Sequence, residues 1–246
     1  QKTAYEIGVR LVGSEMCIRD SSSGGPAGPL VMSAWHWPDD HSISMFDASH
    51  RAAGYWAVDT VNPNCGREVA TYMEATSADI VLGQELKIPD GHLLAQAEQT
   101  ARNAKWSMAI DPCYVSPLEG NSAGTSVAVR NHIGMSHSLV AKESQHLHPP
   151  GHFCMRRVAA MGEGGVHFGS PYLFSMRGKG GIKAQCNLDM LDSMAFTLNG
   201  LVGPWILGGD WNGTPQELAE TGWLQKVGGT IHAPNAATCL SLIHIS

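Results

Sequence analysis

The residues of this sequence with the clearest capacity for chemistry follow a short apolar run. Trp205, Ile206 and Leu207 lead into two glycines, and Asp210 and Asn212 come directly afterwards. An apolar run that stops at glycines predicts a buried strand, which here delivers a carboxylate and a carboxamide at its C-terminal end. A carboxylate in such a place can activate water or help to hold a cation. Asp and Asn are also ordinary turn residues, so a purely structural corner is the alternative.

Three more polar residues lie at or near the ends of predicted strands. Asn62 follows a strand over 55–61, Glu85 ends a strand over 78–85, and Tyr172 lies near the end of a strand over 166–174. If these strands are neighbours, a Mg²⁺ site results, because Mg²⁺ prefers oxygen ligands and retains several waters. Two alternatives stay open: Tyr172 can be a half-buried core residue, and Asn64 competes with Asn62, which is preferred because it lies closer to the strand.

The rest of the pattern predicts a layered α/β fold. Hairpin-connected strands are expected over 125–130, 156–161 and 166–174, separated by loops that contain Gly and Pro. Apolar residues at helical spacing, together with a capping box that begins at Thr214, predict helices over 69–76, 93–104, 182–198 and 214–222. Helix and strand alternation mixed with hairpins indicates an α/β sandwich with predominantly antiparallel pairing.

Composition excludes several classes of protein. The 246 residues are 43% hydrophobic and 15% charged, which suits one large globular domain, and no apolar run is long enough to span a membrane. The formal charge of -6 leaves no general basic surface, so any nucleic acid must be bound by a local patch. The six cysteines form no CxxC pair, which indicates reduced thiols and an intracellular protein, with the nucleus one of the compartments open to it.

The two ends of the chain look foreign to the domain. Residues 1–23 and the final CLSLIHIS resemble translated sequencing adaptors, and a Ser/Gly/Pro-rich linker follows the first of them. We therefore expect a disordered adaptor-like and linker segment at 1–29, a domain at 30–239 that is incomplete at its C-terminus, and an adaptor-like tail at 240–246.

Six segments together resemble the signature stretches of the endonuclease/exonuclease/phosphatase superfamily. In order they are TVNPN at 60–64, ADIVLGQE at 78–85, GTSVAV at 124–129, RVAA at 157–160, SPYL at 170–173 and GGDWNGTPQEL at 208–218. The resemblance spans about residues 55 to 239. It implies a four-layer α/β sandwich of two packed mixed, mainly antiparallel β-sheets, here without the last strands, and hydrolysis of phosphoesters with Mg²⁺ or Mn²⁺.

The resemblance also implies a role for each candidate residue. Glu85 and Asn62 resemble the metal-site pair, with Glu85 the direct ligand. Tyr172 resembles the tyrosine that contacts the scissile phosphate, Asp210 the residue that activates water, and Asn212 its orienting partner. The chain departs from the family pattern after Tyr172, where Phe-Ser replaces Pro-Asn, and it lacks the family's terminal Asp-Tyr/Phe and Ser-Asp-His segments.

Three functions remain open on these grounds. The leading prediction is a Mg²⁺-dependent phosphodiester hydrolase of endonuclease type that acts on DNA, such as the endonuclease domain of a non-LTR retroelement. The alternatives are a phosphatase for a small phosphorylated metabolite or lipid headgroup, and a non-catalytic remnant that binds metal only. The histidine-rich segment from His146 to His152 is predicted to be a solvated loop rather than a transition-metal site, because it holds two prolines and no carboxylate partner.

Overall fold

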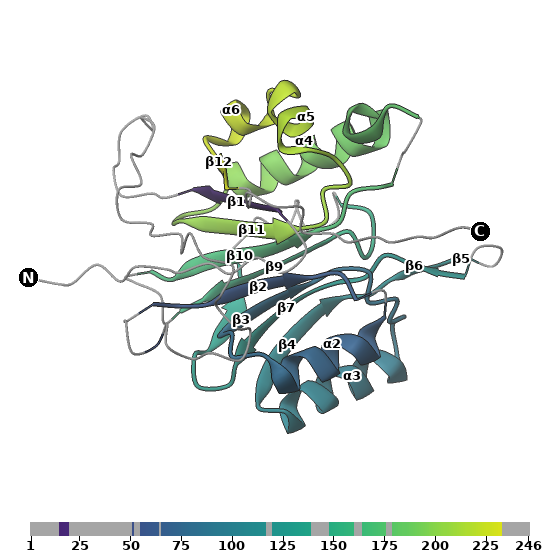
Figure 1. The fold of residues 1–246 in the computed structure, drawn as a ribbon, viewed down its shortest axis with the longest axis vertical. Helices are drawn as coiled ribbons and strands as arrows, with labels where there is room; N and C mark the ends of the chain where they lie inside the picture. Colours follow the sequence, from purple (N-terminus) through teal and green to yellow (C-terminus); the bar gives the residue numbers. More distant parts are fainter. Residues whose placement is uncertain are drawn as a thin grey trace, which may run out of the picture.

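The protein is a sandwich of two β-sheets with a layer of helices outside each sheet, as the computed structural model in Figure 1 shows. The structure describes residues 15–19, 51, 55–63, 65–116, 120–138, 148–159, 164–175 and 179–232. Among the described strands, the β2–β3 and β10–β11 pairs are parallel and the other pairs are antiparallel. The predicted fold class, an α/β sandwich of two packed mixed sheets, is confirmed.

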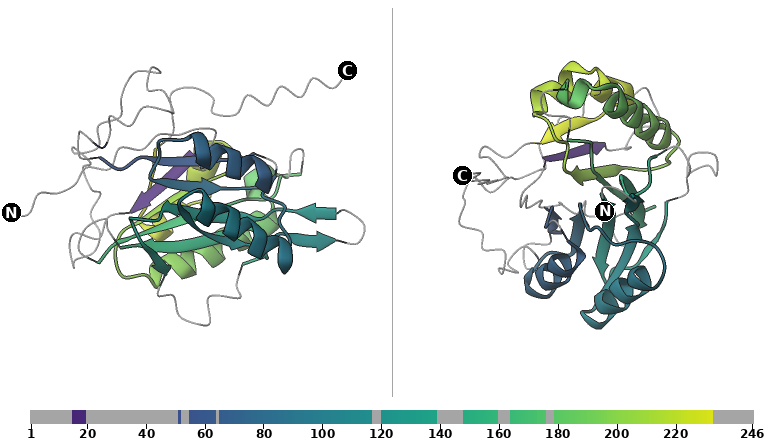
Figure 2. Two further views of the ribbon diagram at one scale, coloured as in Figure 1. Left: turned by 90° about the horizontal axis from the view of Figure 1, so that it is seen from below. Right: turned by 90° about the vertical axis from the view of Figure 1, so that its right-hand side faces the viewer.

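One layer pair consists of a four-stranded sheet and two helices that cover its outer face. The strands, in spatial order, are β2 (Val58–Val61), β3 (Ile80–Gly83), β7 (Thr125–Arg130) and β4 (Trp106–Asp111). The helices are α2 (Gly66–Ala75) and α3 (His92–Asn103). A hairpin of β5 (Tyr114–Ser116) and β6 (Gly120–Ser122) projects beyond this sheet, as Figure 2 shows.

The other layer pair is built on a six-stranded sheet. Its strands, in spatial order, are β12 (Thr230–His232), β1 (Glu15–Arg19), β11 (Trp205–Gly209), β10 (Val166–Pro171), β9 (Phe153–Val158) and β8 (Met135–His137). Its outer face is covered by η2 (Gly181–Lys183), α4 (Gln185–Asn199), α5 (Pro215–Glu220) and α6 (Trp223–Val227). Among the described residues, no helix is both long enough and apolar enough to cross a membrane.

Strand β11 shows why a run of consecutive apolar residues suits the middle of this sandwich. Ile206 packs into the core between the two sheets, with Phe168 and Leu82. Trp205 and Leu207 point to the opposite face and pack under the helices. Successive side chains of a strand alternate between faces, so a strand covered on both sides must be apolar at every position. Each large side chain buried here stabilises the fold by roughly 1.5–3 kcal/mol.

Several local predictions are confirmed. The predicted helices correspond to α2, α3, α4 and α5, and strand β7 covers the predicted residues 125–130. The capping box is present: Thr214 accepts a hydrogen bond from the Glu217 amide, and the Glu217 carboxylate accepts one from the Thr214 amide at 2.7 Å. This cap fixes the start of α5 directly after the Asp210–Asn212 corner.

The N-terminal segment departs from expectation. The sequence predicts that residues 1–29 lie outside the fold, but Glu15–Arg19 form β1, which pairs antiparallel with both β11 and β12. The run Met-Cys-Ile within it is apolar and includes Ile, a strand-favouring residue. The other proposed boundaries, at 29 and 239, fall on residues outside the described part of the chain and stay predictions.

Candidate active site

The predicted site residues lie together at one edge of the sandwich because the strands that carry them end there. Strands β2 and β3 are parallel, so the chain leaves both at the same edge, toward Asn62 and Glu85. Strands β10 and β11 are also parallel, and their pairing continues in a bridge between Tyr172 and Asp210. Adjacent parallel strands therefore position four of the five residues, and Asn212 follows Asp210 in the turn.

Asp210 is held at both of its carboxylate oxygens. The Asn62 side-chain amide donates to Oδ2 at 2.8 Å, and the backbone amide of Asn212 donates to Oδ1 at 3.0 Å. The Asn212 side chain in turn donates to the Leu173 carbonyl at 2.7 Å, which ties the turn to the end of β10. Both donors to Asp210 are neutral, so its negative charge is oriented without being neutralised by a cation in these bonds.

Tyr172 and Glu85 form the second pair of the site. The Tyr172 hydroxyl donates a hydrogen bond to Glu85 Oε1. Burial raises the pKa of the Tyr172 phenol above its ordinary value, and the hydrogen bond to Glu85 and the negative charges of Glu85 and Asp210 raise it further. Tyr172 is therefore protonated at neutral pH, which suits it to donate a hydrogen bond and excludes it as a base.

Glu85 is accessible as well as anchored. Its side chain is 19% exposed, and its Oε2 lies 3.9 Å from Lys87 Nζ, a separation at the limit of an ion pair. The carboxylate thus has one oxygen fixed by Tyr172 and one that faces a partly exposed cation. An exposed pair of this kind contributes about 0–1 kcal/mol, so Lys87 is a weak competitor for another cation.

The backbone at the site adopts conformations that side chains disfavour. Glu85, Lys87 and Asn212 have φ values of +52°, +54° and +46°. For residues other than glycine this left-handed region costs roughly 1–2 kcal/mol each, least for Asn. Such costs persist where surrounding structure imposes them, and they concentrate at functional sites. Two of the five predicted residues carry this cost, which favours a functional role over a plain turn.

The donor set fits a hard divalent cation. Among the described residues no three His, Cys, Asp or Glu side chains gather as a metal cluster. Mg²⁺ needs no such cluster, since one or two protein oxygens and several waters satisfy it. Glu85 offers carboxylate oxygen, and the Asn62 amide nitrogen faces Asp210, which identifies Oδ1 as the acceptor side of that amide. These oxygens suit Mg²⁺ or Mn²⁺ and do not suit a thiophilic metal.

A buried glutamine behind the site joins the two sheets and was not predicted. Gln84 is fully buried, and its amide donates to Ser170 Oγ at 2.8 Å and to the Gly208 carbonyl at 3.3 Å across the interface. It also bonds Thr60 Oγ1 on β2. The only sequence signal for a role of Gln84 was its position next to Glu85. A glutamine at a strand end is usually solvated, so the sequence did not indicate that this one is buried.

The predicted solvated loop over the histidine-rich segment is wrong for Gly151 and His152, which are buried, whereas Pro150 is exposed and His148 and Pro149 are partly exposed. His152 is 5% exposed, and burial lowers the pKa of His148 to about 4. His146 lies outside the described residues. The turn is tied to the end of β4 and to the residue before β7, because the Gly151 amide donates to Asp111 Oδ2 and the Gly151 carbonyl accepts from the Gly124 amide. Proline content suggested solvation, whereas these long-range bonds, which no local pattern encodes, bury Gly151 and His152.

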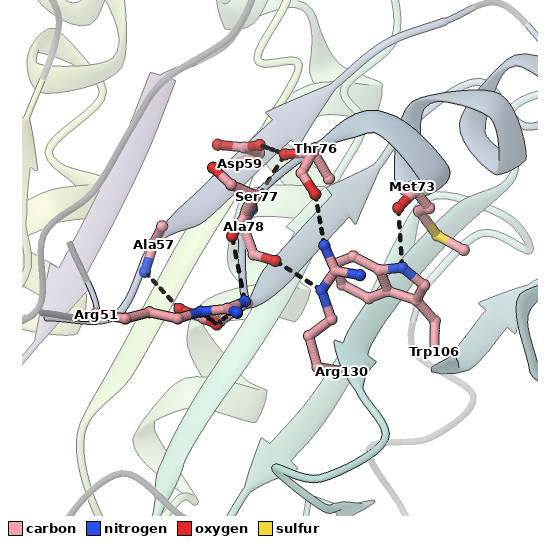
Figure 3. Close-up of polar contacts among 10 residues, drawn as sticks. Arg51, Ala57, Asp59, Met73, Thr76, Ser77, Ala78, Trp106 and Arg130 are labelled. Carbon is pink, nitrogen blue, oxygen red and sulfur yellow. Dashed lines mark hydrogen bonds and ion pairs between the residues drawn. The ribbon is translucent and has the colours of Figure 1, made fainter. Parts of the chain in front are cut away.

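A second polar cluster lies at the other end of β3, before its first residue, and Figure 3 shows it. Arg51 Nη2 lies 2.8 Å from Asp79 Oδ1, and Asp79 also accepts from the Ala57 amide at 3.1 Å. Arg130 stacks 4.0 Å from the Trp106 ring centroid and donates to the Ala78 carbonyl. A cavity of about 600 Å³ opens here, but its guanidinium groups are already bound. We therefore assign these residues a structural role in stabilising the fold.

Comparisons with known proteins add little. No protein-family model matches the chain, and no curated protein matches its sequence. Among solved structures, the chain is similar to the 2′,3′-cyclic phosphatase ANGEL2 in complex with adenosine-2′,3′-vanadate, at 13% sequence identity and a TM-score of 0.35. The match covers 62% of this chain and 44% of that chain. A likeness this slight carries no weight for the function of this chain.

Proposed function

We propose that this protein is a phosphoester hydrolase dependent on Mg²⁺ or Mn²⁺, and a member of the endonuclease/exonuclease/phosphatase superfamily. The supporting observation is the pair of carboxylates at one sheet edge: Asp210, oriented by Asn62 and Asn212, and Glu85, bonded to Tyr172. Metal-assisted hydrolysis of a phosphoester uses a cation, an activated water and a hydrogen-bond donor to the phosphoryl oxygens. These residue types can hold the cation, activate the water and donate the hydrogen bond.

Each residue has a distinct task in this proposal. Glu85 and Asn62 would hold the cation, which would supply Lewis-acid polarisation of the phosphoryl group. Asp210, kept as an oriented acceptor by its two neutral donors, takes the proton of the attacking water, and Asn212 keeps it aligned. Tyr172 retains its proton and donates to a phosphoryl oxygen, where negative charge develops in the transition state.

The finer proposal is an endonuclease that cuts DNA. It rests on the sequence segments that resemble the superfamily, above all those that carry Glu85 and Asp210. A DNA substrate would also require a local basic surface, because the formal net charge of the chain is -6. The same charge favours the second candidate, hydrolysis of a small phosphoester such as a phosphorylated metabolite or lipid headgroup, which needs no extended phosphate-binding surface.

The test compares substrates and metals in one series. The purified protein is incubated with supercoiled plasmid DNA and, separately, with p-nitrophenyl phosphate and bis-p-nitrophenyl phosphate, each with Mg²⁺, Mn²⁺ or EDTA. Glu85→Gln and Asp210→Asn are measured beside Asp192→Asn, a control carboxylate 68% exposed on α4. We expect metal-dependent hydrolysis that both site variants lose and the control keeps. Nicked plasmid selects the endonuclease, and p-nitrophenol release alone selects the small-phosphoester hydrolase.

Two outcomes would reject the proposal. Turnover that survives both Glu85→Gln and Asp210→Asn would show that the reaction takes place at another site. Binding of Mg²⁺ by calorimetry, lost in Glu85→Gln, without turnover of any of the three substrates would select the remaining alternative, a domain that binds metal only.

A further inference from the structure

We infer that His152 is a positioning residue that holds Tyr172 in its orientation toward Glu85. The inference rests on the proposed function, because it concerns how one residue of that site is kept in place. Within the described part of the chain, the hydrogen bonds of His152 reach neither Glu85 nor Asp210, so it would act on the reaction only through Tyr172.

His152 forms hydrogen bonds with both the backbone amide and the backbone carbonyl of Tyr172. The Tyr172 amide donates to the His152 carbonyl at 2.9 Å, and His152 Nδ1 lies 2.6 Å from the Tyr172 carbonyl oxygen. A carbonyl oxygen only accepts hydrogen bonds, so Nδ1 must carry the proton. This bond fixes the tautomer, and burial, which lowers the pKa of His152, keeps the ring neutral.

The rings of the two residues are also in contact. The His152 and Tyr172 rings are stacked with centroids 5.5 Å apart, and the Phe174 ring lies 4.2 Å from His152 on the same segment. Backbone bonds alone set where the Tyr172 Cα lies, whereas a stacked neighbour limits the rotation of its side chain. His152 therefore restricts both the backbone position and the side-chain rotation of Tyr172, which together determine where its hydroxyl points.

The turn that carries His152 is itself fixed from a distant strand. The Gly151 amide donates to Asp111 Oδ2 at 2.8 Å, and the Gly124 amide donates to the Gly151 carbonyl at 2.9 Å. Gly151 has φ of +78°, and a Cβ there would meet the Gly124 nitrogen at 2.8 Å. No side chain fits this position. A rigid base is what a positioning residue needs, since a mobile one would transmit its motion to Tyr172.

Three variants separate the parts of this arrangement. His152→Phe keeps an aromatic ring against Tyr172 and removes the Nδ1 donor. His152→Asn keeps a donor at nearly the same distance from Cα and removes the ring. His167→Phe is the matched control: His167 is 2% exposed and its Nδ1 lies 2.9 Å from Ser138 Oγ, so its side chain is buried and bonded away from Tyr172.

The decisive measurement is a double-mutant cycle with Tyr172→Phe, read in kcat and KM on whichever phosphoester the protein hydrolyses. We expect His152→Phe to lower kcat about tenfold with KM within about twofold, and His152→Asn to recover most of that loss. In the Tyr172→Phe background the His152→Phe effect should shrink below about twofold, because the residue acted on has lost its hydroxyl. Equal losses in both backgrounds, or an equal loss in the His167→Phe control, would overturn the inference.

A second readout needs no activity and so separates this inference from the proposed function. The protein is labelled with 3-fluorotyrosine, and the Tyr172 fluorine signal is assigned from its absence in Tyr172→Phe. His152→Phe should move or broaden that signal, and His167→Phe should leave it unchanged. An unmoved signal in a folded His152→Phe protein rejects the positioning role. A moved signal in a protein without hydrolase activity supports the positioning of Tyr172 by His152 and rejects only the role of that positioning in catalysis.

Discussion

The two ends of strand β3 use similar residues for different purposes. Before the strand, Asp79 is 2% exposed and pairs with Arg51. On the neighbouring strand β2, Asp59 accepts hydrogen bonds from the hydroxyl groups of Tyr72 and Thr76, both at 2.6 Å. After the strand, the side chain of Glu85 is 19% exposed and has Lys87 at 3.9 Å. At the first end the buried charged groups are bonded within the fold, whereas the second end keeps a carboxylate within reach of solvent.

Left-handed backbone occurs at both ends and does not separate them. Glu85 and Lys87 lie in this region just past one end of β3, and Lys105, which lines the cavity at the other end, has φ of +66°. The comparison teaches that a carboxylate at a strand end favours a functional role when solvent can reach it, and a structural role when it is buried and its oxygens are bonded within the fold.

The largest expected effect tests the functional end. Asp210→Asn keeps the shape of the side chain and removes the proton acceptor, so turnover should fall by about 10²–10⁴-fold. Because its donors are neutral, the free energy of unfolding should change by less than about 1 kcal/mol. Steady-state kinetics and urea denaturation on the same preparation measure both quantities. An Asp210→Asn protein that is strongly destabilised but retains turnover would show that Asp210 serves stability instead of catalysis.

The next largest effect concerns the opposite end. Asp79→Asn leaves Arg51 and the buried Ala57 amide without their charged acceptor, so the free energy of unfolding should drop by roughly 2–3 kcal/mol. Turnover per folded molecule should match the unsubstituted protein. Urea denaturation followed by tryptophan fluorescence gives the first quantity. Asp192→Asn, at an exposed ion pair with Lys226, should change it by less than about 1 kcal/mol.

A further acid-sensitive group is His148, which lies in the turn before β9. Burial lowers the pKa of His148 from 6.5 to about 4. The unfolded chain therefore binds this proton below about pH 6.5 and the folded protein does not, so stability present above pH 6.5 is lost as the pH falls toward 4. The contribution is roughly 2 kcal/mol after allowance for partial exposure. His148→Gln should reduce the fall in unfolding free energy between pH 7 and pH 4, and an unchanged pH profile would contradict this assignment.

The smallest expected effect refines the electrostatics beside Glu85. Lys87→Met removes the cation that lies 3.9 Å from Glu85 Oε2. Because this partly exposed pair contributes about 0–1 kcal/mol, the Kd for Mg²⁺ should fall by no more than about fivefold. Isothermal titration calorimetry measures it, with Lys105→Met at the opposite end of the sheet as the control. Weaker Mg²⁺ binding in Lys87→Met would show that this lysine supports the site instead of competing with it.

Local sequence determined most of the elements and placed the candidate site residues at strand ends. The β11 run from Trp205 to Leu207 specified a strand covered on both faces, and the Thr214–Glu217 capping box specified where α5 begins. These features depend on residues within one or two turns of each other, which a sequence displays directly. Strand β4 (Trp106–Asp111) was missed, because its Ser107 and Met108 are only partly buried and interrupt the apolar pattern.

Tertiary structure alone decided which residues meet. Asn62 and Asp210 are separated by 148 positions and Tyr172 and Glu85 by 87, yet both pairs are hydrogen-bonded. The burial of His152 likewise depends on Asp111, at the end of β4, and on Gly124, just before β7. Periodicity and capping describe what one segment prefers, but the order of strands in a sheet follows from how two sheets bury their apolar faces together. Only that packing brings the ends of β2, β3, β10 and β11 to one edge.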